Sequence, residues 1–403
     1  MSFEQAWRWF GPQDPFSLKE IKQTGATGIV TALHQIPIGE VWPIEEIMKR
    51  KSLIEADGLT WSVTESVPVH EDIKKRSGNY RKYVDNYIAT FRNLARCGVD
   101  IVCYNFMPVF DWLRTDLEVV FSDGSITTKF ERKVVVAFDM FMLKRSGAAN
   151  DYSDAELAEA EAYYRGISDK EKDKLLKTIL LGLPGSLEAY TLDAFRDALG
   201  KYNGVGDREL REHLHQFIRD ITPAAEEAGV LLGIHPDDPP FPLFGLPRVV
   251  SKKKDFEEIL EAAESQSNGM TFCPGSLAAD PNNDVVDMSE TFSKRVNFIH
   301  LRNVTKDGKG GFVEDYQLGG DIDMYGVMKP LVIEQNRRAS LGLKSERMPM
   351  RPDHGHLMIP DMHRKGIYPG YSLFGRMRGL AELRGLELGI RRSLEELPGY
   401  KTK

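Results

Sequence analysis

Three short apolar runs of the sequence each end in a side chain that can bind a transition metal. His235 follows residues 230–234, Cys273 follows residues 270–272, and His300 follows residues 296–299. The spacings of 38 and 27 residues are close to the roughly 30 residues of one strand–helix unit in an eight-stranded α/β barrel. Imidazole nitrogen and thiolate sulfur suit a first-row divalent ion. The pattern therefore predicts one metal site built by successive strand ends.

A carboxylate would complete such a site and leave positions open for a substrate. The best candidate is Asp353, in the segment Met350-Arg-Pro-Asp-His-Gly-His356. The alternative is that the two histidines are hydrogen-bonded barrel residues and that Cys273 is a small buried hydrophobic side chain, which is common for cysteine. Three matching strand ends, each followed by a turn residue, favour the shared metal site.

Two arginines flank the predicted ligands in the sequence. Arg302 follows His300 by two residues, and Arg351 precedes Asp353 by two. A guanidinium group can bind a substrate carboxylate through two parallel hydrogen bonds, or it can hold a protein carboxylate in a salt bridge. We expect both arginines to bind the substrate, although the sequence leaves the second role open.

Two asparagines complete the predicted substrate site. Asn105 begins a loop dense in aromatic residues that follows the strand-like run 101–104. Aromatic faces and amides suit a sugar-like ligand, although aromatic loops also serve as plain packing. Asn303 directly follows Arg302, and we expect it to contact the same ligand.

The segments that must position these residues alternate between strand-like and helix-like patterns. Strand-like runs cover residues 28–34, 59–65, 99–104, 230–235, 270–273 and 296–301. Amphipathic helices are predicted over 84–95, 210–228, 256–263 and 378–390. The sequence has no Gly-x-Gly-x-x-Gly after a strand and no Gly-x4-Gly-Lys-Ser/Thr, so an open nucleotide-binding sheet is disfavoured. A closed (β/α)8 barrel is the predicted fold.

One region departs from this alternation. Between about 115 and 205 the sequence carries a hairpin signal at Asp123-Gly124 and charged helical stretches over 155–164 and 169–181. We interpret it as a large mixed insertion, either a cap over the barrel mouth or an oligomer contact. Residues 1–403 are then one barrel domain.

Composition excludes several functional classes. The 53 Lys and Arg residues against 60 Asp and Glu residues give a formal charge of −7, and no concentrated basic face suggests a nucleic-acid partner. No apolar run approaches the roughly 20 residues of a membrane helix, and the first residues lack a secretion signal. Three scattered cysteines agree with a reducing compartment. We expect a cytoplasmic enzyme with a small-molecule substrate and neither a nucleic-acid nor a membrane partner.

Five motifs in order resemble the mannonate dehydratase family of the hexuronate (glucuronate) degradation pathway. They are Trp7-Arg-Trp-Phe-Gly-Pro-Gln-Asp-Pro15, Trp61-Ser-Val-Thr-Glu-Ser-Val-Pro-Val-His-Glu71, Tyr104-Asn-Phe-Met-Pro108, His300-Leu-Arg-Asn303 and Met350-Arg-Pro-Asp-His-Gly-His356. The resemblance runs from the first ten residues to the last predicted helix. It implies a xylose-isomerase-like barrel and a hydro-lyase that converts D-mannonate to 2-keto-3-deoxy-D-gluconate and water.

The resemblance also implies a cofactor and catalytic residues. The family metal is Mn²⁺ or Fe²⁺, and its ligands match the same four residues that the strand spacing predicts. The family's catalytic residues match His354 and Tyr371, with Tyr368 in Ile367-Tyr-Pro-Gly-Tyr371 as the alternative to the latter. The sequence does not decide which of His354 and Tyr371 is the acid and which is the base.

Three other functions compete with this interpretation. A sugar isomerase or epimerase would use the same barrel mouth and metal but would retain the hydroxyl group. A metal-dependent endonuclease is disfavoured by the negative net charge and by the few ligands at strand ends. A purely structural metal would have four ligands in short loops, whereas these span residues 235 to 353. A homodimer is expected because two-fold assemblies are the commonest.

Overall fold

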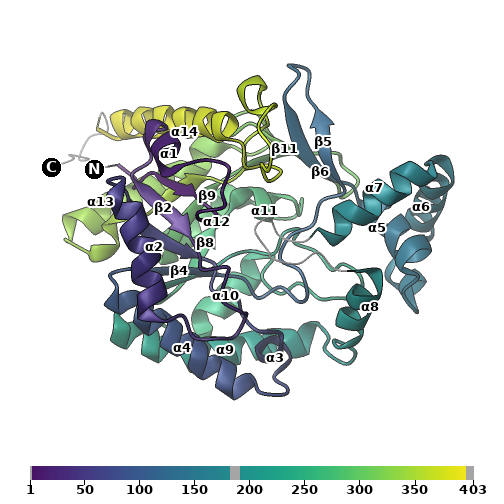
Figure 1. Cartoon of the computed structure of the whole chain (residues 1–403), viewed down its shortest axis with the longest axis horizontal. Coiled ribbons are helices and arrows are strands. Elements are labelled where there is room, and N and C mark those ends of the chain that lie inside the picture. Colours follow the sequence, from purple (N-terminus) through teal and green to yellow (C-terminus); the bar gives the residue numbers. More distant parts are fainter. Residues whose placement is uncertain (1, 182–190, 396–403) are drawn as a thin grey trace.

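Eight parallel strands form the centre of the computed structural model, which describes residues 2–181 and 191–395 (Figure 1). In sheet order they are β1 (Ala6–Arg8), β2 (Gly28–Thr31), β3 (Thr60–Glu65), β4 (Ile101–Tyr104), β7 (Leu231–Ile234), β8 (Asn268–Phe272), β9 (Val296–Leu301) and β12 (Met350–Pro352). A parallel bridge between Gln5 and Met350 joins β12 to β1. The sheet therefore closes into the predicted barrel.

Helices cover the outside of this barrel (Figure 1). They are α1 (Leu18–Gln23), α2 (Ile44–Ala56), α3 (Glu71–Lys75), α4 (Tyr80–Arg96), α9 (Asp207–Ala228), α10 (Lys253–Ala262), α12 (Val285–Phe292), α13 (Met324–Ser340) and α14 (Leu373–Glu395). The short α11 (Pro274–Ala278) instead follows Cys273 at the barrel mouth, where Ser276 contacts Cys273 and Arg302. The helix α9 buries one apolar face and ends at Gly229, whose φ of 68° carries no steric cost for glycine. None of the helices in the described ranges combines the length and the apolar character needed to cross a membrane.

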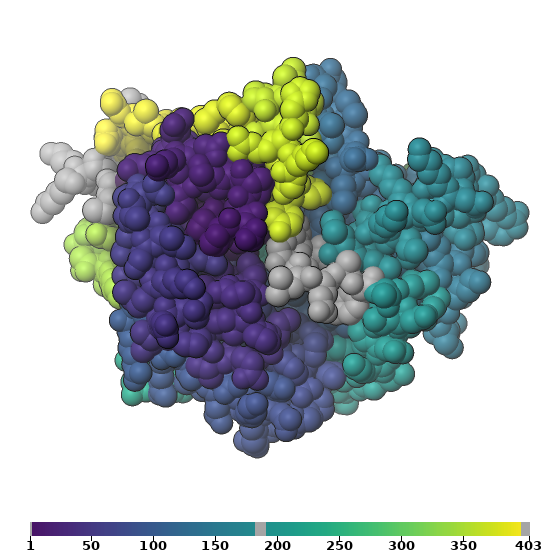
Figure 2. Space-filling view, viewed as in Figure 1, coloured from purple at the N-terminus to yellow at the C-terminus, as the bar shows by residue number. Residues whose placement is uncertain are grey.

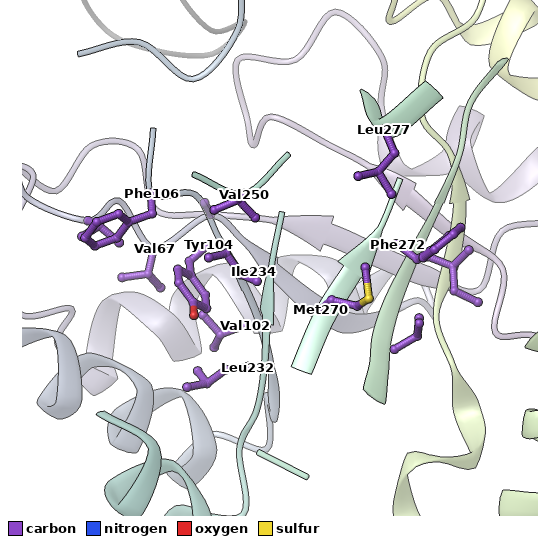
Figure 3. Close-up of a cluster of buried hydrophobic side chains, with 14 of the residues drawn as sticks. Val67, Val102, Tyr104, Phe106, Leu232, Ile234, Val250, Met270, Phe272 and Leu277 are labelled. Atoms are coloured by element: carbon purple, nitrogen blue, oxygen red, sulfur yellow. The ribbon is translucent and has the colours of Figure 1, made fainter. Parts of the chain in front are cut away.

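Side chains alternate between the two faces of the barrel wall, because successive strand residues point in opposite directions. One set packs under the helices and is drawn in Figure 3: Val102, Tyr104, Leu232, Ile234, Met270 and Phe272. The other set fills the barrel interior and includes Val63, Cys103 and Phe298. His235, Cys273 and His300 continue this inward alternation, so the strands β7, β8 and β9 direct them into the barrel mouth.

The chain between β4 and α9 stands beside the barrel in Figures 1 and 2. It contains β5 (Asp116–Val120), β6 (Ile126–Phe130), α5 (Arg132–Ala137), α6 (Asp154–Gly166), α7 (Asp169–Leu180) and α8 (Leu192–Gly200). The hairpin at Asp123-Gly124 and the helices near 155–164 and 169–181 are thus confirmed. Residues 182–190 of the predicted insertion lie outside the described residues. The hairpin also joins β10 (Asn303–Lys306) and β11 (Phe312–Asp315) in an antiparallel sheet, in the order β10-β11-β6-β5.

Candidate metal centre and active site

Three potential metal ligands converge inside the barrel mouth. Atoms of His235, Cys273 and His300 all lie within 4.8 Å of one another, and His235 Nε2 is 3.1 Å from His300 Nδ1. Two nitrogens bound to one ion at about 2.1 Å are roughly 3 Å apart. The donor set and its spacing fit a divalent transition metal.

The outer nitrogen of each imidazole faces a hydrogen-bond acceptor. His235 Nδ1 lies 2.7 Å from the carbonyl oxygen of Pro236, and His300 Nε2 lies 3.3 Å from Glu65 Oε2. When these outer nitrogens carry the protons, the inner nitrogens present lone pairs toward the same point. Carboxylate or carbonyl partners commonly fix metal-binding histidines in this way.

Asp353 lies beside two of these three residues. Its Oδ2 is 3.8 Å from Cys273 Sγ, and its Oδ1 is 3.8 Å from His300 Nδ1. Burial alone would raise the pKa of this carboxyl group, but Arg351 and the neighbouring histidines hold the pKa well below its usual range. Asp353 therefore supplies a buried anion at the edge of the cluster.

Arg351 joins Asp353 to a residue that the sequence analysis missed. Its guanidinium donates to both carboxylate oxygens of Glu65, at 3.1 and 2.8 Å, while Nη1 lies 2.7 Å from Asp353 Oδ1. Burial opposes ionisation of Glu65, yet Arg351 and His300 hold its pKa well below normal. This arginine thus takes the salt-bridge role that the sequence left open, as a clamp on two carboxylates.

Arg302 belongs to a second buried ion-pair network. Its Nε donates to Glu314 at 2.8 Å and its Nη1 to Asp238 at 2.6 Å. Arg114 bridges the same two carboxylates from the other side, at 2.9 Å to Asp238 and 2.5 Å to Glu314. Among the described residues, no group forms a hydrogen bond with Arg302 Nη2. This N–H group is the part of Arg302 that remains for a ligand.

The two asparagines differ in their surroundings. Asn303 uses its whole amide on the main chain: Nδ2 donates to the carbonyls of Gln317 and Ile322, and Oδ1 accepts from the amides of Val304 and Ile322. It holds the loop after β11 and has no group left for a substrate. Asn105 is half-buried and directly follows β4, at the barrel mouth.

His354 and Tyr371 lie next to each other, with ring centroids 5.3 Å apart at 75°. Burial raises the pKa of Tyr371 to about 12, and the charges that act on its hydroxyl are those of Arg351, Asp353, Glu65 and Arg8. Both tyrosines pack against Phe10, at 4.5 Å for Tyr368 and 5.0 Å for Tyr371 between centroids, but the ring contact with His354 is made by Tyr371. The geometry favours Tyr371 over Tyr368 as the partner of His354.

Sequence reasoning missed Glu65, Asp238 and Glu314, for different reasons. Glu65 ends a predicted strand, just as His300 does, so its position was a usable signal. Asp238 follows the strand end at His235 by three residues, which is a weaker signal. Glu314 lies on β11, outside the barrel sheet, and strand-end spacing could not have identified it.

Comparisons with known proteins agree with these observations. The family model for D-mannonate dehydratase (UxuA) matches residues 3–396. A mannonate dehydratase from Marinomonas sp. (strain MWYL1) is 52% identical over 392 residues, which covers 97% of this chain and 100% of the relative. One from Chromohalobacter salexigens is 50% identical over 389 residues, covering 96% and 99%.

Solved structures give the same result. A crystal structure of mannonate dehydratase from Streptococcus suis serotype 2 superposes with a TM-score of 0.76 at 34% identity and covers 99% of this chain and 98% of that one. A xylose isomerase-like TIM barrel protein from Mycobacterium smegmatis, at a TM-score of 0.50 and 12% identity over 97% of each chain, shares the fold. The chain therefore belongs to the mannonate dehydratase family.

Proposed function

We propose that this chain eliminates water from D-mannonate to give 2-keto-3-deoxy-D-gluconate, with Mn²⁺ or Fe²⁺ held by His235, Cys273, His300 and Asp353. The observation that carries the proposal is the convergence of two imidazoles and a thiol within 4.8 Å at consecutive strand ends. That donor set suits a first-row ion better than Mg²⁺. Relatives half identical to this chain are named mannonate dehydratase.

The reaction needs negative charge to develop next to a carboxylate, which is unfavourable without a nearby cation. A bound divalent ion supplies Lewis-acid stabilisation of that charge. The surrounding residues set the geometry: Glu65 orients His300 through its outer nitrogen, and Arg351 holds both Glu65 and Asp353 in place.

His354 and Tyr371 carry the protons in this proposal. One group removes the proton from C2, and the other protonates the C3 hydroxyl as the C3–O bond breaks and water leaves. The resulting enol takes a proton at C3 and becomes the 2-keto acid. Because burial raises the pKa of Tyr371 to about 12, the phenol keeps its proton at neutral pH. We assign the acid role to Tyr371 and the base role to His354.

Substrate contacts are assigned to the groups that the protein leaves available. Arg302 Nη2 lacks a hydrogen-bond partner among the described residues, and we propose that it donates to a substrate oxygen. We also propose that Asn105, half-buried after β4, binds a hydroxyl group. Arg351 and Asn303 act by positioning other parts of the site.

A product assay tests the proposal directly. Purified protein loaded with Mn²⁺ is incubated with D-mannonate, and the 2-keto-3-deoxy acid is measured with thiobarbiturate. D-gluconate, which differs only at C2, is the control substrate. We expect the chromophore with D-mannonate alone. An isomer of mannonate without the chromophore would instead indicate a sugar isomerase or epimerase.

We also propose a wider setting for the enzyme. It acts in hexuronate (glucuronate) catabolism in the cytoplasm, as a homodimer and as one barrel domain over residues 1–403 with an insertion near 115–205. All three cysteines are free and buried, which is compatible with a reducing compartment. Light scattering on the purified chain measures the oligomeric state, and a monomer would contradict the proposed dimer.

A further inference from the structure

We propose that Glu314 is a positioning residue for His354: its carboxylate accepts a hydrogen bond from Nδ1–H, which keeps that proton on Nδ1 and so makes Nε2 the atom that exchanges protons with the substrate. The inference rests on the proposed function only for the identity of the reaction. The contact between the Glu314 carboxylate and the His354 imidazole does not depend on which substrate is used.

The contact joins two buried side chains, Glu314 on β11 and His354 in the loop after β12. Glu314 Oε1 lies 3.3 Å from His354 Nδ1, and the two residues are 1% and 7% exposed. The pair is at ion-pair distance, and within residues 2–181 and 191–395 no group, Glu314 included, meets hydrogen-bond geometry with this nitrogen. A buried Nδ1–H group without an acceptor would be costly. Glu314 is therefore the available acceptor for Nδ1–H.

The carboxylate itself is rigidly held. Arg302 donates to Oε2 at 2.8 Å, and Arg114 donates to Oε1 at 2.5 and 3.1 Å. Asp238 accepts from the same two arginines, so two cations balance two anions. Although burial opposes ionisation, the arginines hold the pKa of Glu314 far below its usual range. His354 thus faces a fixed negative charge.

The main chain of Glu314 is fixed from both sides. Thr127 Oγ1 of β6 donates to its carbonyl oxygen at 3.2 Å, and His356 Nε2 lies 3.1 Å from the same oxygen. The register of β11 is set by the pair Phe312 and Phe130, whose rings stack at 5.5 Å. Because β11 pairs with β6, the β5–β6 hairpin helps to hold the Glu314 carboxylate in the active site.

A fixed acceptor on one imidazole nitrogen determines which tautomer is present. With the proton on Nδ1, the lone pair of Nε2 is free to accept a proton. When His354 becomes an imidazolium, the same carboxylate stabilises the new charge, because the interaction takes place in a buried site. Glu314 then acts through His354 and has no need to contact the substrate.

The test compares Glu314→Gln with Asp238→Asn. Each variant removes one negative charge from the same four-residue network, but only Glu314 contacts His354. We expect Glu314→Gln to lower kcat by roughly 10- to 100-fold, with KM and metal content within about twofold of wild type. Asp238→Asn, which loses the same charge but no contact with His354, should lower kcat clearly less than Glu314→Gln does. Equal losses of kcat in the two variants would overturn the inference, because they would show a purely structural network.

A double mutant separates action through His354 from an independent effect. Added to His354→Asn, Glu314→Gln should cost no further activity, since its target is already gone. Multiplicative losses would overturn the inference. If Glu314→Gln does not fold, Glu314→Asp keeps the charge for the arginines, withdraws the oxygen from Nδ1, and is expected to lower kcat in the same way.

A readout without turnover keeps this inference separate from the proposed function. Nitrogen-15 NMR of the zinc-loaded enzyme, with the signals assigned through His354→Asn, should show the proton on Nδ1 in wild type and a mixture of tautomers in Glu314→Gln. This result would stand even if D-mannonate were not the substrate. If the wild-type enzyme dehydrated D-mannonate but carried the His354 proton on Nε2, the inference about Glu314 would be wrong while the proposed function would stand.

Discussion

His235 Nε2 and His300 Nδ1 face each other at 3.1 Å across the barrel mouth. The outer nitrogens of both rings lie near acceptors, at Pro236 O and Glu65, and these acceptors favour the tautomer of each ring with its proton on the outside. Two inward lone pairs at this distance repel each other unless a cation lies between them. The surroundings of the two rings therefore favour metal binding before any ion arrives.

Removal of the metal should abolish activity. Dialysis against a chelator is expected to eliminate product formation, and Mn²⁺ or Fe²⁺ should restore it better than Mg²⁺, because Mg²⁺ prefers an all-oxygen site. Product formation with thiobarbiturate detection and elemental analysis of the same samples provide the measurement. Full activity after exhaustive chelation would contradict the metal hypothesis.

Cys273→Ser should weaken metal binding by more than about tenfold, since a neutral hydroxyl replaces a thiolate ligand. Loss of sensitivity to thiol oxidation is expected in the same variant. Cys97→Ser is the matched control, because Cys97 follows α4 on the outside of the barrel. An unchanged metal affinity in Cys273→Ser would show that Cys273 is a packing residue and not a metal ligand.

Adjacent substitutions should separate a ligand from a catalyst. Asp353→Asn is expected to lower metal occupancy, whereas His354→Asn should keep metal and fold and lower kcat on the order of 10²- to 10⁴-fold. Metal content per chain and kcat are measured on both variants. If His354→Asn lost the metal but kept normal activity per bound ion, His354 would be a ligand or a support for one.

Six of the eight barrel strands could be predicted because they are apolar runs with a turn signal after them. The strands β1 and β12 were missed: each has only three residues and carries an inward arginine, Arg8 or Arg351, so neither shows a strand-like apolar pattern. The metal ligands could be predicted because strand ends recur at a regular spacing. This regular spacing is a property of the barrel fold, and it can be read from the sequence alone.

The ion-pair networks could not be predicted in the same way. Glu314 and Arg114 are 200 residues apart, and they meet only because β11 pairs with β6 beside the barrel. Nothing in the local pattern around either residue indicates such a partner. The sequence therefore placed Arg302 and Arg351 near the site correctly but could not show that protein carboxylates already occupy most of their N–H groups.

Tyr371→Phe should lower kcat on the order of 10²-fold, since the ring packing against His354 remains and only the proton donor is lost. Tyr368→Phe is the control and should keep a kcat near wild type, because the ring contact with His354 is made by Tyr371. Steady-state kinetics with D-mannonate measure both. The reverse order of effects would transfer the acid role to Tyr368.

His34 should make the folded state less stable as the pH falls. Its Nε2 lies 3.1 Å from Arg8 Nη2, and burial, together with the charges of Arg8 and Arg50, lowers the pKa of His34 to about 3. An unfolded histidine has a pKa of about 6.5. Between these values the unfolded chain binds a proton that the folded chain does not, so its stability rises with pH. The contribution of His34 is complete above about pH 6.5 and declines below it.

The measurement is the melting temperature between pH 7 and pH 5 for wild type and His34→Gln. Glutamine keeps an acceptor for Arg8 but does not titrate. The melting temperature of the variant should therefore decrease less on acidification than that of wild type. His363→Gln is the matched control because His363 is exposed, and its Tm should follow the wild-type slope. Other buried histidines, such as His356, whose pKa burial also lowers, keep part of the slope in every variant. Parallel curves for wild type and His34→Gln would show that His34 does not destabilise the folded chain in acid, and that the cluster of Arg8 and His34 accepts a proton without cost.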